Sequence, residues 1–332
     1  ISVMKFKQNE KEMHYAISWI IQITNCSFYD KDNDLIFSEL IRFWHFICII
    51  YYRSITQENS FKDIFSSAIS TIITFLVKNV VSPYSFIEFS SNTNNRVQNS
   101  LSLDSYESSL YDTMKETLII LYHLKKDELF GVISSQISLI QSNQFQAETI
   151  NSISWTIGAI AKIITPEENT SMMNLVVPIF IQLINAENPS NIPTIEEIRL
   201  TASKALLFMC SQEARYFRNN PEFLGSLMQM ILKFLISESS HLNIIAIHTF
   251  NSLSKSCKQT FLIPIPPSNE MIISGILTDL PTFINQMRPE HRSIFISSIA
   301  DIIFLYVSSS IGYQRIILDN FLNQVSSIFL QS

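Results

Sequence analysis

Hydrophobic residues recur at helical spacing along almost the whole chain. The clearest case is the segment 107–124, in which Leu110, Met114, Leu118 and Leu121 fall at positions i, i+4, i+8 and i+11. Side chains at this spacing share one face of an α-helix, and the charged residues of the segment fall off that stripe. The pattern therefore predicts an amphipathic helix.

The same period predicts a series of helices with little else between them. We expect helices over residues 12–28, 34–53, 60–80, 107–124, 126–141, 147–164, 169–186, 194–212, 221–237, 241–257, 269–287, 290–308 and 312–330. Prolines and polar turns separate them, several near a first helical turn, where the missing N–H costs nothing. With only five glycines in 332 residues, a hairpin-rich β protein is disfavoured.

From Asp127 onward the helix pairs repeat at approximately forty-residue intervals, the spacing of HEAT and armadillo repeats. Each such pair buries its apolar face on the next pair. The sequence therefore predicts an all-α fold, a HEAT-repeat α-solenoid that forms a single array over residues 1–332. Because the chain begins with Ile1 and not Met, we take it to be a central piece of a longer protein.

The segment from Ser82 to Ser105 interrupts the helical period. Two short apolar runs flank the polar sequence Ser-Ser-Asn-Thr-Asn-Asn, a pattern typical of a β-hairpin or a long loop. We expect 82–105 to be an inserted β-hairpin-like loop and the only extended segment of the chain. A plain solvated surface insertion is the alternative.

Composition narrows the possible functions. Hydrophobic residues make up 47% of the chain and its mean hydropathy is +0.20, while the net charge is −6 with no block of Lys and Arg, which disfavours nucleic-acid binding. The most apolar run, Phe43 to Tyr52, contains His45 and is far short of the roughly 20 residues of a membrane span. We expect it to be a buried helix. Four scattered cysteines predict reduced, buried thiols.

No group of residues indicates a reaction. The glycines are isolated, so the phosphate-binding and nucleophile-elbow motifs are missing, and the six histidines show no metal-ligand spacing. The adjacent carboxylates Glu167-Glu168 and Glu196-Glu197 point to different helix faces and suit the first turn of a helix. We expect no catalytic residues, no metal and no cofactor, and a chain that is not an enzyme.

Two motifs resemble a known family. The run Leu110-Tyr-Asp-Thr-Met-Lys-Glu-Thr-Leu-Ile-Ile-Leu-Tyr-His-Leu124 is similar to "Leu-Tyr-x-x-Met-Arg-Glu-Thr-Leu-x-x-Leu-x-His-Leu", and Ser154-Trp-Thr-Ile-Gly-Ala-Ile160 is similar to "Trp-x-Ile-Gly-Ser-Ile" at a matching distance. Both motifs belong to the exportin-1 family of karyopherin-β nuclear export receptors. Further echoes lie at Gln212–Phe217, Glu222–Phe234, Ala246–Phe250 and Ser256–Phe261.

The resemblance implies a function and partners. Receptors of this family carry cargo proteins out of the nucleus by binding leucine-rich export signals in a hydrophobic groove between adjacent HEAT repeats, together with Ran-GTP. It also implies contact with nucleoporins and shuttling between nucleus and cytoplasm, without direct nucleic-acid binding or membrane insertion. The segment 82–105 matches the family's inter-helix loop. Another karyopherin-β receptor, or a HEAT-repeat scaffold unrelated to transport, is the alternative.

Residue-by-residue transfer places the groove in 168–258, on two repeats. The wall positions, all apolar or aromatic, are Ile179, Leu183, Leu207, Tyr216, Phe223, Leu227, Phe234 and Ile245. Any HEAT helix has such a stripe, so a purely structural core is the alternative. Three rim positions that are lysine in the family fall on Glu196, Arg199 and Met230. The family's reactive cysteine falls at Ala186 or, with a one-residue shift, at Asn185.

Overall fold

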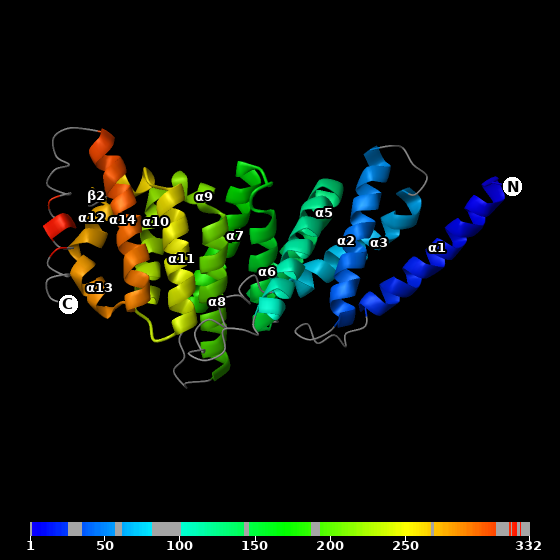
Figure 1. The fold of residues 1–332 in the computed structure, drawn as a ribbon, viewed down its shortest axis with the longest axis horizontal. Coiled ribbons are helices and arrows are strands. Elements are labelled where there is room, and N and C mark those ends of the chain that lie inside the picture. The colour runs from blue at the N-terminus through cyan, green and yellow to red at the C-terminus, as the bar shows by residue number, and fades with distance from the viewer. Residues whose placement is uncertain are drawn as a thin grey trace. The chain divides into compact units, whose positions relative to one another are not determined.

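The computed structural model describes residues 2–25, 35–56, 62–81, 101–142, 146–186, 193–266 and 269–309, together with 319, 321–323 and 326. These residues are almost entirely helical (Figure 1). The chain divides into two compact units, Ile1–Ile163 and Ile164–Ser332. The segment 168–258 lies wholly in the second unit.

The first unit consists of helices packed around an apolar core. They are α1 (Ser2–Asn25), α2 (Leu35–Thr56), α3 (Lys62–Asn79), α5 (Leu101–Gln141) and α6 (Ala147–Ile160). The central contacts are those of α2 and α3 with α5, and of α5 with α6. Within the apolar run Phe43 to Tyr52, one face is buried, at Trp44, Ile47, Cys48 and Tyr51, whereas Phe46 and Tyr52 are exposed.

Helix α2 is also the one described helix that is long and apolar enough, by length and composition, to cross a membrane. Its segment Leu35–Arg53 is 44% buried within the protein. The core helix of a folded domain meets the same criteria, and the inward face of α2 packs on α3 and α5.

Helix α5 contains the break that the sequence predicts between 107–124 and 126–141. Lys125 has φ −148° and ψ 54°, outside the helical range, so α5 is two helical segments joined at this residue. The motif around Met114 lies on the first segment. The predicted helix–helix boundary is thus confirmed.

The prediction that 82–105 is the only extended segment is wrong. Residues 82–100 lie outside the described part of the chain, and residues 101–105 belong to helix α5. A two-residue strand β1 (Pro264–Ile265) pairs with β2 (Glu270–Met271) in antiparallel fashion. Pro264 cannot occupy a helix interior but tolerates the start of a strand. Asn269, with φ 55°, supplies the left-handed turn residue between the strands.

The second unit continues as a stack of helices. They are α7 (Pro166–Ile184), α8 (Pro193–Gln212), α9 (Ala214–Arg218), α10 (Pro221–Leu235), α11 (Ser240–Ser256), the 3-10 turn η1 (Thr260–Leu262), α12 (Ile272–Thr278), α13 (Leu280–Gln286) and α14 (Pro289–Ser309). The predicted helix 269–287 is replaced by strand β2 and the two short helices α12 and α13. The described residues of 312–330 are 319, 321–323 and 326, and all are helical.

A set of side-chain hydrogen bonds shows the repeat length directly. Hydroxyl or thiol donors of one repeat reach backbone carbonyls of the preceding repeat: Thr249 to Leu207 (3.1 Å, 42 residues apart), Ser252 to Ser211 (3.0 Å, 41 apart), Cys257 to Ala214 (3.1 Å, 43 apart) and Thr260 to Arg218 (3.0 Å, 42 apart). We call this set the inter-repeat ladder. It confirms the forty-residue period.

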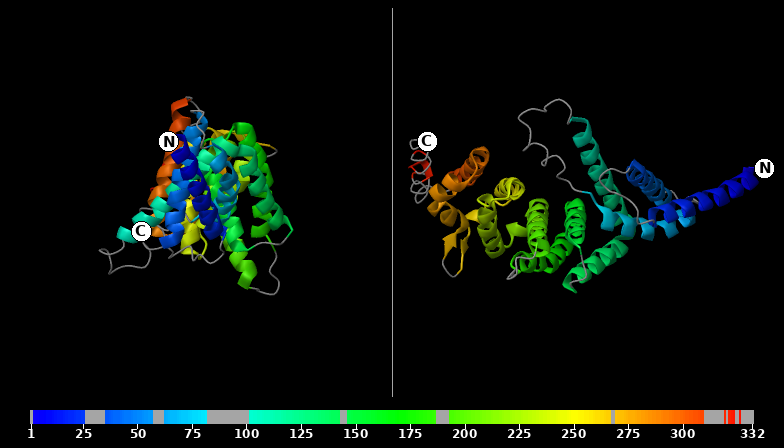
Figure 2. Two further views of the ribbon diagram at one scale, coloured as in Figure 1. Left: turned by 90° about the vertical axis from the view of Figure 1, so that its right-hand side faces the viewer. Right: turned by 90° about the horizontal axis from the view of Figure 1, so that it is seen from below.

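Helix α11 is the centre of this arrangement, because it packs on α8, α10 and α14. The right-hand view of Figure 2 looks nearly along several of these helices, which lie side by side. Pairs of helices stacked at a fixed period are the architecture of a HEAT-type repeat. The predicted fold class, an all-α helical-repeat solenoid, is confirmed.

Candidate functional site

Helix α7 begins with a strong N-terminal signal. Thr165 accepts a hydrogen bond from the Glu168 N–H at 3.3 Å, and the Glu168 carboxylate accepts one from the Thr165 N–H at 3.0 Å, which completes a capping box. Pro166 occupies the first helical turn, where it costs no hydrogen bond. The helix continues past Pro178 to Ile184. It packs on α8 and contacts α9.

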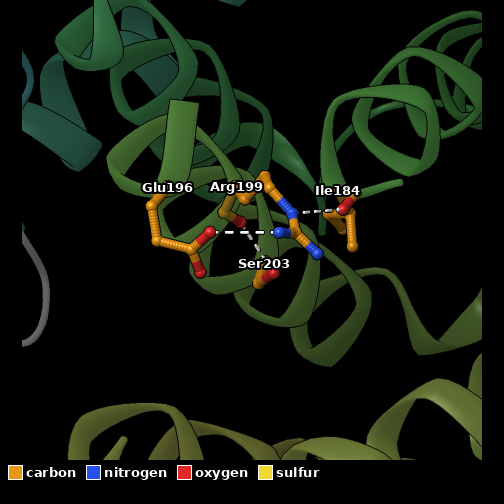
Figure 3. Close-up of polar contacts among 4 residues, drawn as sticks. All are labelled: Ile184, Glu196, Arg199 and Ser203. Atoms are coloured by element: carbon orange, nitrogen blue, oxygen red, sulfur yellow. Dashed lines mark hydrogen bonds and ion pairs between the residues drawn. The ribbon is translucent and has the colours of Figure 1, made fainter. Parts of the chain in front are cut away.

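Arg199 fixes the C-terminal end of α7 to helix α8. Its Nε donates to the Ile184 carbonyl at 3.0 Å, while its Nη1 lies 3.0 Å from a carboxylate oxygen of Glu196 (Figure 3). Ser203 in turn donates to the Arg199 carbonyl at 2.8 Å. Arg199, the rim position that keeps a positive charge, therefore caps the C-terminal end of α7.

Helix α9 contacts α7, α10 and α11. The Tyr216 hydroxyl lies 2.6 Å from the Asn174 side-chain oxygen of α7. The Tyr216 ring meets Phe223 of α10 edge-on, with centroids 5.7 Å apart, and Phe223 stacks on Phe217 at 5.8 Å. This aromatic cluster of Tyr216, Phe217 and Phe223 fixes α9 against the first turn of α10.

A pocket of about 520 Å³ opens beside the aromatic cluster. Its lining comes from α9, the following turn and the first turns of α10: Tyr216, Asn219, Asn220, Pro221, Glu222, Phe223 and Ser226. Among these lining residues Glu222 is the only charged one. Polar and apolar groups thus meet in one concave site.

Helix α10 carries an apolar flank. Phe223, Leu227, Met230 and Phe234 follow one another at i, i+4, i+7 and i+11, so they share one side of the helix. Leu227 is buried, whereas Phe223, Met230 and Phe234 are half-buried. This row, called the α10 flank below, contains three of the predicted wall residues.

One side of helix α7 faces helix α9. The bond to Tyr216 shows that Asn174 faces α9. Pro178, Ile181 and Asn185 follow Asn174 at i+4, i+7 and i+11 and so share its side. Ile179 and Leu183 lie roughly 140–180° around the helix from Asn174 at 3.6 residues per turn, and the structure does not bring them to that side.

The other predicted wall residues lie in the interior. Leu207 on α8 is 0% exposed and Ile245 on α11 is 4% exposed. The Leu207 carbonyl belongs to the inter-repeat ladder. Among the eight wall positions, Tyr216 and Phe223 form an edge-on ring pair.

The rim and cysteine positions are placed as follows. Glu196 is exposed, Arg199 and Met230 are half-buried, Ala186 is half-buried, and Asn185 is exposed and ends α7. Asn185 shares the side of Asn174 on α7.

Buried polar chemistry lies just behind the aromatic cluster. Glu213, which precedes α9, is 0% exposed, and burial raises the pKa of its carboxyl to about 8, although the charge of Arg215 lowers it. Neither carboxyl oxygen of Glu213, nor the side-chain oxygen of the buried Asn169, meets a hydrogen-bond partner among the described residues. A neutral, protonated Glu213 suits these surroundings.

The three described cysteines are buried and unpaired. Burial raises the pKa of Cys48 to about 12 and that of Cys257 to about 11. Burial and the nearby Glu213 raise the pKa of Cys210 further. Thiols of this kind hold little thiolate at neutral pH and react slowly. Within the described ranges, no three His, Cys, Asp or Glu side chains are placed to hold a metal ion.

Some of these features can be recognised in the sequence, although the helical period alone does not reveal them. The capping box at Thr165 is visible as Thr-Pro-Glu-Glu, a standard helix start. The role of Asn174 has no such signal, because its partner Tyr216 lies 42 residues away. Glu213 is likewise an ordinary surface residue type that only the fold shows to be buried.

Several known proteins of similar sequence are named as exportins. Exportin-1 of Dictyostelium discoideum is 20% identical over 342 residues, which cover 99% of this chain and 31% of that protein. Protein EXPORTIN 1A of Arabidopsis thaliana is 22% identical over 197 residues (58% of this chain, 18% of that protein). Exportin-1 of Drosophila melanogaster is 20% identical over 209 residues (63% and 19%). No family model matches the chain.

The chain thus spans less than a third of the length of these relatives. The identities are low, but the matching proteins from an amoeba, a plant and an insect are all exportins, and the first match runs along nearly the whole chain. The motifs of α5 and α6 and the helical-repeat fold agree with that match. The chain is therefore similar in sequence to exportin-1 proteins, along nearly its whole length in the case of the Dictyostelium discoideum protein.

Proposed function

We propose that this chain is part of a nuclear export receptor whose second unit binds leucine-rich export signals of cargo proteins. The observation that supports the proposal best is the α10 flank, which joins the aromatic cluster beside α9. An amphipathic peptide helix docks by inserting apolar anchors at i, i+3 or i+4, and i+7. The half-buried side chains of Phe223, Met230 and Phe234 lie at i, i+7 and i+11 and offer such anchors one continuous side of α10.

The binding energy would come from apolar burial. Each fully buried Leu, Ile or Phe anchor contributes about 1.5–3 kcal/mol, and ordering of a flexible peptide costs about 2–5 kcal/mol or more. Four anchors would thus outweigh the ordering cost, whereas one or two would not. A row of apolar positions along α10 meets this requirement better than the isolated pocket does.

The partners of the whole receptor follow from the relatives and are part of the proposal. We propose that Ran-GTP acts with the full-length protein to load cargo, that nucleoporins contact it during passage, and that the receptor shuttles between nucleus and cytoplasm. No reaction is assigned to this chain. Hydrolysis of GTP would take place on Ran.

A binding measurement with the full-length protein tests the proposal. A fluorescent leucine-rich signal peptide is titrated with the protein, with and without Ran-GTP, and its anisotropy is followed. We expect saturable binding that Ran-GTP strengthens, and loss of binding when the peptide anchors are changed to alanine. Equal binding of the alanine peptide, or no binding in either condition, would favour a different karyopherin cargo or a repeat scaffold outside transport.

A further inference from the structure

The pocket beside the aromatic cluster is lined by a charged residue, whereas the α10 flank contains none. Glu222 is one of its lining residues, together with Phe223, Tyr216, Asn219 and Asn220. Aromatic rings attract cations through their faces, and a carboxylate attracts them by charge. The arrangement therefore suits a positively charged side chain better than a neutral or acidic one.

Neighbouring positive groups do not neutralise this site. Arg218 on α9 donates to the Ser256 carbonyl at 2.7 Å and is not among the pocket-lining residues. Arg215 lies close enough to Glu213 to lower the pKa of that buried carboxyl. Lys233 lies three helical turns beyond Glu222 on α10. Glu222 thus keeps the only charge lining the pocket.

The charges at the predicted groove rim also favour a basic peptide. Of the three rim positions, Glu196 is acidic, Met230 is neutral, and Arg199 is held by Ile184 and Glu196. Acidic groups on a bound peptide would find no free cation at these positions. Basic groups would find Glu222 and the exposed Glu197.

We propose that the pocket between α9 and α10 takes an arginine or lysine side chain of the bound peptide, held by Glu222 and by the rings of Phe223 and Tyr216. This inference rests on the proposed function, because it names the kind of signal peptide that the same surface accepts. The cation would lie at one end of the peptide, next to the first anchor position on Phe223. Signals with basic flanks are then preferred over signals with acidic flanks.

Three peptides with identical apolar anchors, flanked by Arg, Gln or Glu, test the inference with the full-length protein. We expect the Arg peptide to bind about 3–10-fold more tightly than the Gln peptide, from one ion pair and one cation–π contact in a partly exposed site. The Glu peptide should bind most weakly. Raising the salt to about 0.5 M should shrink these differences, because the charges are near the surface.

Variants locate the effect. Glu222→Gln should remove the preference and Glu222→Lys should reverse it in favour of the Glu peptide. Glu148→Lys is the matched control, because Glu148 is also a glutamate in the first turn of a helix, α6 of the other unit. It changes the net charge equally and should leave the preference unchanged.

The outcomes separate the two proposals. Binding of all three peptides with equal affinity, or a preference that survives in Glu222→Lys, would overturn the cation pocket and leave the proposed function in place. No binding of any peptide would overturn the proposed function and this inference with it.

Discussion

The Tyr216 hydroxyl of α9 lies 2.6 Å from the side-chain oxygen of Asn174 on α7, across 42 residues of sequence. Through this bond and the stacking of Phe223 on Phe217, the five-residue helix α9 is tied to both α7 and α10. It determines which side of each longer helix faces the candidate site. The site therefore depends on a short element that a period of 3.6 residues does not reveal.

Removing that hydroxyl should loosen the junction. Tyr216→Phe keeps the ring contacts and deletes one hydrogen bond, so we expect the free energy of unfolding to fall by about 0.5–1.5 kcal/mol in urea titrations. Asn174→Ala in the Tyr216→Phe background should cost little more, because the shared bond is already lost. Tyr15→Phe, at a residue 70% exposed on α1, serves as control. Fully additive losses would show that the bond contributes nothing.

A substitution on the α10 flank should affect peptide binding more than it affects the stability of the fold. Phe234 is half-buried near the end of α10. Phe234→Ala should weaken binding of a leucine-rich peptide by roughly 2–3 kcal/mol, as expected for a side chain that contacts an anchor, while the melting temperature changes less. Phe304→Ala, at a residue 76% exposed on α14, is the matched control. If Phe234→Ala lowers the melting temperature and leaves the peptide affinity intact, Phe234 belongs to the core.

The buried Glu213 predicts that stability falls as the pH rises. Burial raises the pKa of its carboxyl to about 8 in the folded protein, against about 4.3 in an unfolded chain. The folded state therefore holds the proton more tightly. This contribution to stability is complete below about pH 4.3 and is lost as the pH rises through about 8.

Glu213→Gln stays neutral and tests this directly. Between about pH 6 and pH 9 the wild type should lose stability relative to Glu213→Gln, by up to a few kcal/mol, measured as unfolding free energy at each pH. Glu148→Gln, in the first turn of α6, should follow the wild-type profile. Parallel profiles for wild type and Glu213→Gln would mean that Glu213 ionises normally.

Covalent inhibitors of the leptomycin type alkylate a thiolate, and the three described cysteines are buried with raised pKa values. We expect Cys48, Cys210 and Cys257 to remain unmodified. Asn185→Cys should confer modification, because Asn185 is exposed and shares the side of α7 that Asn174 presents to α9.

The Ala186→Cys variant is the matched comparison, because it places the new thiol one residue further along the chain. It should react more slowly than the Asn185→Cys variant. Peptide mass mapping after treatment decides between the two positions. Faster modification of the Ala186→Cys variant would contradict the placement of this side of α7.

The sequence predicts most of the fold because helix limits are local. The helix over 107–124 ends at Lys125, as its period indicates, and Pro166, Pro221 and Pro289 each open a helix. The hairpin between η1 and α12 escapes prediction, because two residues per strand carry no period and its place against α10 depends on packing. Gly225 of α10 leaves space for strand β1, because a Cβ atom there would lie 3.0 Å from the Ile265 Cδ1 atom.

The candidate site is harder to predict than the fold. A shift of one residue turns a helical side chain by about 100°, so transfer by resemblance at 20–22% identity can place a residue on the wrong side of its helix. Tyr216 and Phe223 are less sensitive, because the short α9 and the proline at 221 fix their positions.

The inter-repeat ladder has a mechanical consequence. All four rungs join the same two neighbouring repeats, with the carbonyls within 207–218 and the donors within 249–260, so a pull that separates these repeats is resisted by four bonds at once. A tether at the end of α14 should therefore first detach α14 from α11, and the unit should then yield at the ladder in one larger step, in which the four carbonyls lose their donors together.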